Sequence, residues 1–336
     1  MRKQIFTKIS ILLMVSLIMG YATFAQAQTT KPSPIKLSLV TYTVVTDAHF
    51  QHWKPLFIDA VNAQSKGELV IEVRGGPEVM SIADMAKATA SGVTDMAVAS
   101  TANFADFVPG CDLIKLSEIA WQDEITRGVP AYMEELYAKV GLKFISRKMP
   151  INTNYFRICL KKKITTIEGF KGIKLGGPPP IHGAFAALGA APVRAVIPEY
   201  YTALERGVVD GTIFGGGVYD ENALFEVAPF VVNHPFFRPT AMLMMNLKRW
   251  EALPKHLQDL ILRVRDDMQK KYEPVYLDWE RAVIAKVTAK GSQYYTLPPD
   301  VASWYSRTIY DGAWTADAPK NPPDVVAKIK SLVTKR

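Results

Sequence analysis

Short segments with a strand-like pattern alternate with helical segments along the chain. Residues 35–39 and 69–73 alternate apolar and polar side chains, which predicts two strands with one buried face each. Between them, residues 50–61 carry large apolar side chains at helical spacing, and Pro55 predicts a kink in that helix or a place in its first turn. An apolar run at 95–99 predicts a third, buried strand. This alternation is typical of an α/β fold.

The helical patterns have recognisable starts and stops. A capping-box sequence at 81–84 predicts a helix that stops at Gly92. Residues 125–140 place apolar side chains on one face and predict another helix. The longest helical pattern covers 257–290, where Pro274 predicts a kink or a break.

The N-terminal residues have the pattern of a secretory signal peptide. Basic residues precede an apolar stretch at 9–20, which is too short to span a bilayer comfortably, and residues 25–27 read Ala-Gln-Ala, a cleavage signal. We therefore expect residues 1–27 to be removed and the remaining chain to be exported to the periplasm.

Composition and charge narrow the class of protein. Of the 336 residues, 49% are hydrophobic and 21% are charged, which suits a folded chain with an ample core, divided into two lobes. Removal of residues 1–27 takes away three basic residues and no acidic one, so the formal net charge falls from +8 to +5. This mild excess gives no reason to expect a nucleic-acid partner. Cys111 and Cys159 either form a disulfide or are two buried free thiols.

Catalytic and cofactor motifs are absent from the sequence. It contains no G-x-S-x-G elbow, no H-E-x-x-H helix, no Walker loop and no C-x-x-C pair. His49 and His52 are three residues apart and would share one face of a helix, but no cysteine or third histidine lies near them. We expect no metal and no cofactor, and we interpret His49 as a helix-start residue or a contact at the mouth of a cleft. These observations favour binding over catalysis.

Several segments in order resemble one protein family. Residues 166–175 read TIEGFKGIKL, residues 189–193 read GAAPV, and residues 198–211 read PEYYTALERGVVDG. Residues 66–73 (KGELVIEV) and 88–96 (ATASGVTDM) add two more fragments. Together, in this order and spacing, they resemble the periplasmic solute-binding subunit of TRAP transporters (tripartite ATP-independent periplasmic transporters, the DctP-type family).

This resemblance implies a two-lobed periplasmic binding protein fold with hinge strands and a long helix, residues 257–290, across both lobes. Lobe I would contain residues 28–152 and about 240–280, and lobe II residues 153–239 and about 281–336. The lobes would close around one solute in the cleft between them. The solute would shift the population from the open to the closed conformation, because the closed conformation makes more contacts with it. The protein would then deliver the solute unchanged to membrane permease subunits. It would not be an enzyme, and we expect a monomer.

Departures from the family pattern fall on positions that hold the solute. The resemblance places a solute-binding arginine where this chain has Gly176, and further family positions fall at Phe156, beside Arg157, and near Phe214. Glycine and aromatic rings at these places predict a roomier, more apolar pocket, suited to an aromatic or otherwise hydrophobic acid. Neighbouring residues on a strand face opposite sides, so Phe156 and Arg157 do not both point into the cleft unless a bulge intervenes. Core packing is the alternative role for the two phenylalanines.

Other candidate ligand-binding residues lie in loops that follow strands, where open α/β sheets bind ligands. Their polar groups can orient a solute, although each is also a common cap or turn residue. These candidates are Thr43, His49, Glu78, Ser100, Thr101 and Tyr219.

Four functional hypotheses follow. The first is a TRAP-type receptor for an aromatic or hydrophobic acid, and the second is a receptor for a small aliphatic carboxylate held by Arg157. The third is an exported enzyme with an unrecognised acid pair, and the fourth is a sensor domain that reports occupancy to a signalling partner.

Overall fold

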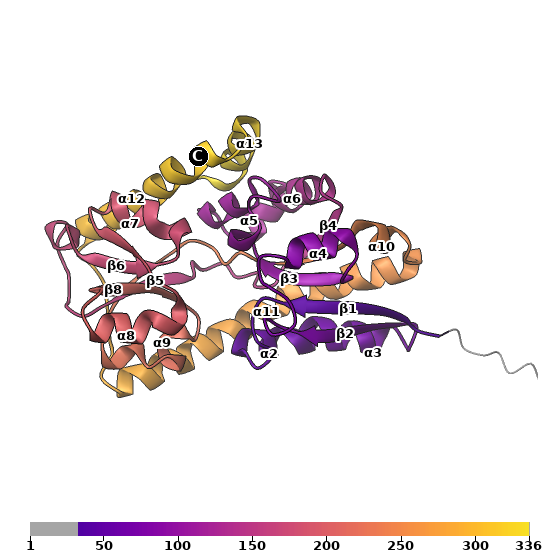
Figure 1. The fold of residues 1–336 in the computed structure, drawn as a ribbon, viewed down its shortest axis with the longest axis horizontal. Helices are drawn as coiled ribbons and strands as arrows, with labels where there is room; N and C mark the ends of the chain where they lie inside the picture. The colour runs from indigo at the N-terminus through magenta and orange to yellow at the C-terminus, as the bar shows by residue number, and fades with distance from the viewer. Residues whose placement is uncertain (1–32, 336) are drawn as a thin grey trace, which may run out of the picture. The chain divides into compact units, whose positions relative to one another are not determined.

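A computed structural model describes residues 33–335, in which the chain forms two mixed β-sheets covered by helices (Figure 1). The predicted signal peptide, residues 1–27, lies outside the described residues. Sheet A contains, in spatial order, β2 (Leu69–Gly75), β1 (Ile35–Thr41), β3 (Met96–Ser100), β10 (Ala241–Asn246) and β4 (Leu142–Arg147). Sheet B contains β11 (Gln293–Tyr295), β9 (Phe230–Phe236), β5 (Phe156–Leu160), β8 (Gly211–Gly215), β6 (Lys174–Gly177) and β7 (Ala191–Arg194). The predicted α/β class and two-lobed fold are confirmed.

The helices divide between the two lobes and the connections that bridge them. The short helices between the strands of sheet A are α2 (Ala48–Lys54), α3 (Ala60–Gln64), α4 (Met85–Ser91), α5 (Trp121–Thr126) and α6 (Val129–Ala138), and α10 (Leu247–Glu251) follows its last strand, β10. Those between the strands of sheet B are α7 (His182–Ala187), α8 (Tyr200–Glu205) and α9 (Val218–Glu221). The last three helices are α11 (Lys255–Ala289), α12 (Pro299–Asp317) and α13 (Pro323–Val333).

The chain crosses between the sheets twice, and each crossing produces the antiparallel strand of the sheet that it enters. Residues 148–155 lead from β4 to β5, which runs antiparallel to β8 and β9. Residues 237–240 lead from β9 to β10, which runs antiparallel to β3 and β4. The two crossing segments are joined to each other, since the Tyr155 amide donates to the Phe237 carbonyl over 2.8 Å.

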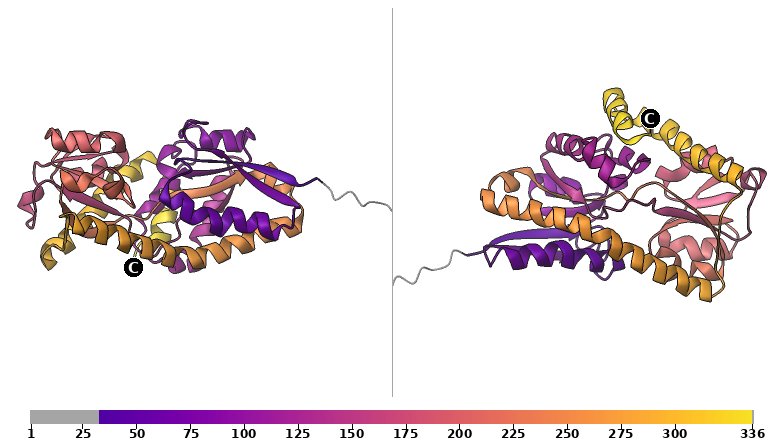
Figure 2. Two further views of the ribbon diagram at one scale, coloured as in Figure 1. Left: turned by 90° about the horizontal axis from the view of Figure 1, so that it is seen from below. Right: turned by 180° about the vertical axis from the view of Figure 1, so that it is seen from behind.

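Helix α11 runs along both lobes (Figure 2). Its N-terminal part buries side chains such as Leu257 and Ile261 in the same core as the strands of sheet A. Its C-terminal part reaches sheet B, where Lys286 forms an ion pair with Asp220 of α9 over 2.7 Å. The helix continues through Pro274, so the break that this proline allowed does not occur.

Two local expectations were wrong, and both corrections concern where a helix begins or ends. The predicted helix 125–140 is divided at Gly128, whose φ of 83° is left-handed, so α5 ends before this residue and α6 begins after it. The capping box at 81–84 does not form, because α4 begins at Met85 and Asp84 makes no side-chain cap hydrogen bond. Pro55 does interrupt its helix, since α2 ends at Lys54 and a π-helical turn, Pro55–Asp59, follows.

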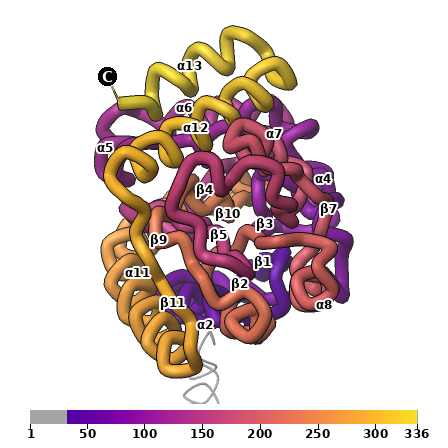
Figure 3. The backbone as a smooth tube through the Cα atoms, turned by 90° about the vertical axis from the view of Figure 1, so that its left-hand side faces the viewer, coloured from indigo at the N-terminus to yellow at the C-terminus, as the bar shows by residue number. Residues whose placement is uncertain are grey.

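The C-terminal helices form a second bridge between the lobes. Helix α12, which the sequence patterns did not indicate, packs against α7 of the sheet B lobe. Helix α13 lies beside α6 of the sheet A lobe (Figure 3). An ion pair of 2.9 Å between Asp317 of α12 and Lys115, which precedes β4, ties this bridge to the sheet A lobe.

The structure answers the question about the two cysteines and adds two observations on residues 33–335. Cys111 and Cys159 are both free and buried, so the alternative of two free thiols holds. Every helix in this part of the chain is too short or too polar to cross a lipid bilayer. No three histidine, cysteine, aspartate or glutamate side chains of these residues gather closely enough to hold a metal ion.

Candidate functional site

The carboxyl ends of the parallel strands of both sheets face the crossing segments. In sheet A, β1, β2, β3 and β4 share one direction, and the chain leaves for sheet B from the end of β4. In sheet B, β6, β8 and β9 share one direction, and the chain returns from the end of β9. Open α/β sheets bind ligands at the carboxyl ends of their strands. The candidate site is therefore the junction where these two sets of strand ends meet.

Four rings from three parts of the chain meet at this junction, and we call them the junction cluster. They are His49 of α2, Tyr155 of the first crossing segment, and Tyr276 and Trp279 of α11. The His49 ring centroid lies 4.7 Å from that of Trp279 and 5.9 Å from that of Tyr276. The Tyr155 hydroxyl and His49 Nε2 form a hydrogen bond of 3.1 Å. The cluster thus offers flat apolar faces with a few polar edges.

The electrostatics of the junction cluster follow from its burial. Removal from water lowers the pKa of His49 from 6.5 to about 4, an effect that nearby Lys148 and His52 reinforce and Asp47 partly opposes. His49 is therefore neutral at pH 7. Burial also raises the pKa of Tyr155 well above 10, so its hydroxyl group remains protonated.

Gly216 brings the sheet B lobe into contact with the junction cluster. It follows β8 and has a left-handed φ of 55°. A Cβ atom at this position would lie only 2.0 Å from His49 Nε2 and 2.6 Å from the Tyr155 hydroxyl oxygen. The two lobes can approach this closely because residue 216 has no side chain.

Arg157 is connected to the junction cluster, but its charge already has a partner. Its Nη1 donates to Glu280 Oε1 over 2.9 Å, and its Nε donates to Asn233 over 3.3 Å. The same Glu280 oxygen accepts from the Tyr276 hydroxyl over 2.8 Å. β5 pairs with β8 residue for residue through Phe156 and Arg157, so β5 has no bulge at Arg157. The register shift in its pairing with β9 places the extra residues in β9, between Val232 and Phe236.

Gly176, Phe214 and Tyr219 lie within the packed interior of the sheet B lobe. A Cβ atom at Gly176 would lie 3.1 Å from Thr212 Cγ2 and 3.2 Å from Val209 Cγ1, so this glycine leaves no open space on that side. Phe214 stacks on Tyr219 with 4.7 Å between ring centroids. The Tyr219 hydroxyl donates to the Ala228 carbonyl over 3.0 Å. Phe156, by contrast, is half-buried at the start of β5 and packs edge-on against Tyr155.

The loop candidates of the sheet A lobe mostly have local partners. Exposed Glu78 accepts a hydrogen bond of 2.6 Å from the Gly76 amide, which lowers the pKa of its carboxyl group. Ser100 Oγ lies 3.4 Å from Thr240 Oγ1 of the second crossing segment, and Thr101 donates to Asp112 over 2.6 Å. Thr43 differs, because its buried hydroxyl oxygen has no hydrogen-bond partner among the described residues.

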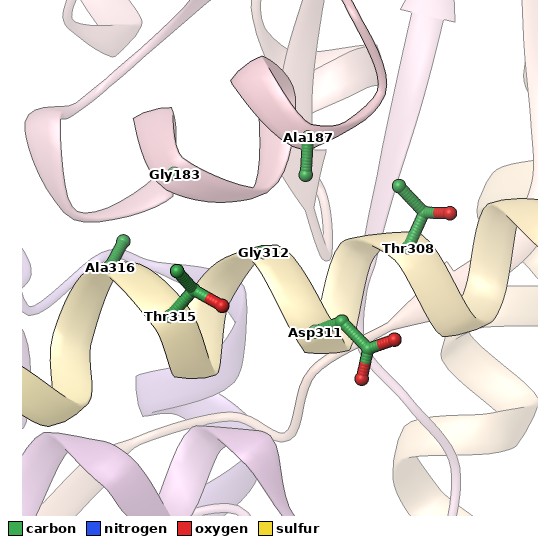
Figure 4. Close-up of a pocket in the computed structure, with 7 residues that line it drawn as sticks. All are labelled: Gly183, Ala187, Thr308, Asp311, Gly312, Thr315 and Ala316. Atoms are coloured by element: carbon green, nitrogen blue, oxygen red, sulfur yellow. The ribbon is translucent and has the colours of Figure 1, made fainter.

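A surface pocket of about 500 Å³ lies between α7 and α12 (Figure 4), and no residue of the junction cluster lines it. Its lining residues are Gly183, Ala187, Thr308, Asp311, Gly312, Thr315 and Ala316. The small residues allow close helix packing, since a Cβ atom on Gly183 would lie 2.2 Å from that of Ala316. None of the predicted site residues lines this pocket, and Asp311 points away from α7.

Of the predicted residues, the structure places only His49 in the junction cluster. Tyr155, Tyr276 and Trp279 were not among the sequence candidates. Tyr276 and Trp279 are three residues apart on the longest predicted helix, and this spacing is also that of an ordinary buried helix face. Only the three-dimensional structure shows that this face continues past the core of sheet A to the junction.

Comparison with known families gives one match over most of the chain. Residues 43–309 match family 7 of the bacterial extracellular solute-binding proteins, DctP. This match confirms the resemblance inferred from the sequence fragments.

Individual proteins add relatives in sequence and in fold. An uncharacterized protein of Haemophilus influenzae is 27% identical over 157 residues, and the match spans 45% of this chain and 44% of that protein's length. A TRAP periplasmic solute-binding protein from Rhodobacter sphaeroides, in an apo open structure, is similar with a TM-score of 0.70 and 23% identity, over 89% of this chain and 96% of the other. One from Desulfovibrio salexigens with bound orotic acid has a TM-score of 0.75 and 17% identity, over 89% and 98% of the two chains.

Proposed function

Because the chain belongs to family 7 of the bacterial extracellular solute-binding proteins, we propose that it is the extracytoplasmic solute receptor of a TRAP transporter. The receptor binds one organic acid between its lobes and delivers it unchanged to membrane permease subunits. The family consists of solute-binding proteins and not of enzymes, so an exported enzyme is no longer a competing hypothesis.

The proposed receptor works in the periplasm after removal of residues 1–27. Its proposed lobe I contains residues 28–152 and about 240–280, and lobe II contains residues 153–239 and about 281–336. The distribution of strands supports this division, since β1 to β4 and β10 form sheet A and the other strands form sheet B. The crossing segments are the proposed hinges, and the solute is enclosed as the lobes turn about them.

The solute in this proposal is an aromatic or otherwise hydrophobic acid. The observation that carries the proposal is the junction cluster, in which His49 of the sheet A lobe and the rings of Tyr155, Tyr276 and Trp279 surround the place where the lobes meet. Such faces stack on planar rings. Orotic acid, which is bound to the relative from Desulfovibrio salexigens, is a planar ring with a carboxylate.

The alternative solute, a small aliphatic acid held by Arg157, receives less support. The Arg157 guanidinium already contacts Glu280 and Asn233, and a carboxylate would have to compete with the ion pair of 2.9 Å.

A thermal-shift screen of the purified protein tests the proposed function. The panel contains benzoate, phenylacetate and orotate as ring acids, and succinate, pyruvate and lactate as aliphatic acids. A ligand at 100 times its Kd stabilises the folded state by about 2.7 kcal/mol, which raises the melting temperature by several degrees. We expect a ring acid to do so and to be recovered unchanged by mass spectrometry. A shift with aliphatic acids alone would contradict the ring preference, and chemical conversion of a bound acid would contradict the receptor role.

A further inference from the structure

The ammonium group of Lys148 is buried and forms no hydrogen bond within residues 33–335. Lys148 follows β4 at the start of the first crossing segment, and its side chain is fully shielded from solvent. Its backbone amide donates to the Ala241 carbonyl, which fixes its position. No acceptor within residues 33–335 forms a hydrogen bond with its ammonium nitrogen. A buried donor in this state is costly, because water no longer satisfies it and no protein group replaces the water.

The groups around this ammonium compensate for its burial only in part. Asp47 Oδ1 lies 3.8 Å from Lys148 Nζ, beyond hydrogen-bond distance, and already accepts from the Phe50 amide over 2.9 Å. The ammonium also lies over the rings of Tyr42 and Phe50, at 5.7 Å and 5.6 Å from their centroids. Burial outweighs these attractions and lowers the pKa of Lys148 from 10.5 to about 8.

The other buried cations among the described residues all have close oxygen partners, with nitrogen–oxygen distances of 2.9 Å or less. Lys115 contacts Asp112 and Asp317, Arg147 contacts Glu124, Arg157 contacts Glu280, and Arg238 donates to the Ile119 carbonyl. Lys148 is therefore the exception within this part of the chain. A structural role like that of the other four would give it a similar partner.

Other buried polar atoms without partners lie on the first strand of sheet A, on the loop after it, and on two rings near Asp47. The hydroxyl groups of Thr41, Thr43 and Tyr272 and the Nδ1 atom of His49 are buried and have no hydrogen-bond partner among residues 33–335. Thr41 ends β1, the first strand of sheet A, and the loop after it contains Thr43. The negative charge of Asp47 contributes to the raised pKa of Tyr272 and opposes the lowered pKa of His49, so these groups share one electrostatic environment. A cation and several hydroxyl groups without partners are what a carboxylate requires.

We propose that Lys148 binds the carboxylate of the solute, while the junction cluster binds its apolar part. This inference rests on the proposed function and specifies the ligand as a ring that bears one carboxylate. The carboxylate lies at the sheet A edge, where the ammonium donates to one of its oxygens and nearby hydroxyl groups donate to the other. Lys148 is enclosed in the present arrangement of the lobes, so the acid enters only when they separate.

Matched pairs of acid and amide test this proposal by titration calorimetry. The probes are benzoate with benzamide, and orotate with its primary amide, which keep the ring and remove the charge. Lys148→Met keeps an unbranched apolar side chain of nearly the same length but removes the ammonium. We expect it to weaken binding of the acid about 10- to 100-fold, the usual effect of a charged hydrogen bond, and to leave binding of the amide unchanged.

Asp47→Asn is the complementary variant. Its amide oxygen still caps α2, whereas the negative charge 3.8 Å from Lys148 is gone. We expect this variant to bind the acid at least threefold more tightly than the unmodified protein and the amide equally well. If Lys148→Met fails to show a cooperative melting transition, Asp47→Asn alone decides the question.

The outcomes separate this inference from the proposed function. A ring acid that binds the unmodified protein and both variants with the same acid-to-amide ratio would overturn the role of Lys148 and leave the receptor function intact. An unmodified protein that binds no acid of the panel would overturn the proposed function, and the role of Lys148 with it.

Discussion

Gly216 provides the sharpest test of lobe closure, because the space for a side chain at this position is occupied by the opposite lobe. A Cβ atom there would lie 2.0 Å from His49 Nε2, which is 1.4 Å less than the 3.4 Å at which ordinary contact begins. His49 cannot easily withdraw, since Tyr155 holds it by a hydrogen bond and Trp279 packs against its ring. We predict that Gly216→Ala weakens solute binding.

Gly216→Ala has two energetic costs, and only one of them depends on closure of the lobes. A left-handed backbone with a side chain costs about 1–2 kcal/mol whether the lobes are open or closed. The overlap with His49 arises only when the lobes meet, and overpacking of this kind costs about 2 kcal/mol. A closed state that is less stable by this amount raises the apparent Kd about 30-fold.

A matched control separates the two costs. Gly172, in the turn before β6, also has a left-handed φ, 74°, but a Cβ atom there would meet nothing within 4 Å. Gly172→Ala therefore carries the backbone strain without the overlap. Titration calorimetry with the best acid of the screen should show a Kd near that of the unmodified protein for Gly172→Ala and a much higher one for Gly216→Ala.

The result that would refute this reasoning is equal affinity in the two variants. Both would then carry the same strain, and contact between Gly216 and His49 would not belong to the solute-bound state. Melting temperatures of the ligand-free variants serve as the internal check, because the strain alone should lower both by a similar amount.

Three further predictions concern charge and thiol chemistry. The unfolded chain takes up a proton at His49 below pH 6.5, whereas the folded protein does so only near pH 4. The free energy of unfolding should therefore fall by about 3 kcal/mol as the pH decreases between these values. Urea unfolding measures this decline, which should be shallower for His49→Gln. Arg157→Met leaves Glu280 without its cation and should lower the free energy of unfolding by about 1–3 kcal/mol in urea titrations. It should change the Kd for a ring acid less than threefold. A large loss of affinity would favour the aliphatic-acid alternative. Burial raises the pKa of the Cys159 thiol to about 11 and that of the Cys111 thiol well above 9. Both thiols should therefore react with a thiol reagent only after denaturant is added. Rapid reaction of the native protein would contradict their buried placement.

The sequence predicted the parts of the fold that depend on local pattern. The first three strands and the long helix appear where alternation and helical spacing placed them. The errors occur where one residue decides between local alternatives. At Gly128 a left-handed glycine ended a helix whose apolar face looked continuous. Pro274 is not such an error, because the sequence allowed a kink as well as a break, and the helix continues past it with the neighbouring Tyr272 and Tyr276 buried.

The candidate site was less predictable, because its residues meet only through tertiary structure. His49, Tyr155 and Tyr276 come from segments more than a hundred residues apart, and no spacing rule connects them. Lys148 gave no signal for a related reason. A lysine in a sequence is usually exposed, and only the folded chain shows that the ammonium group of this one is buried without a hydrogen-bond partner in the described part of the chain.

The position of β10 has a consequence for the order in which this protein matures. The strand lies between β3 and β4 of sheet A, although about a hundred residues of sheet B separate it from β4 in the chain. A ribosome or an export channel releases the chain from its N-terminus, so β3 and β4 emerge with bare hydrogen-bonding edges and wait for residues 241–246. The sheet B segment 156–236 can assemble most of its strands during this interval. Sheet A thus begins first but stays open until β10 emerges, although sheet B still lacks β11 at that point. The unpaired edges of β3 and β4 are the natural place for a chaperone to bind.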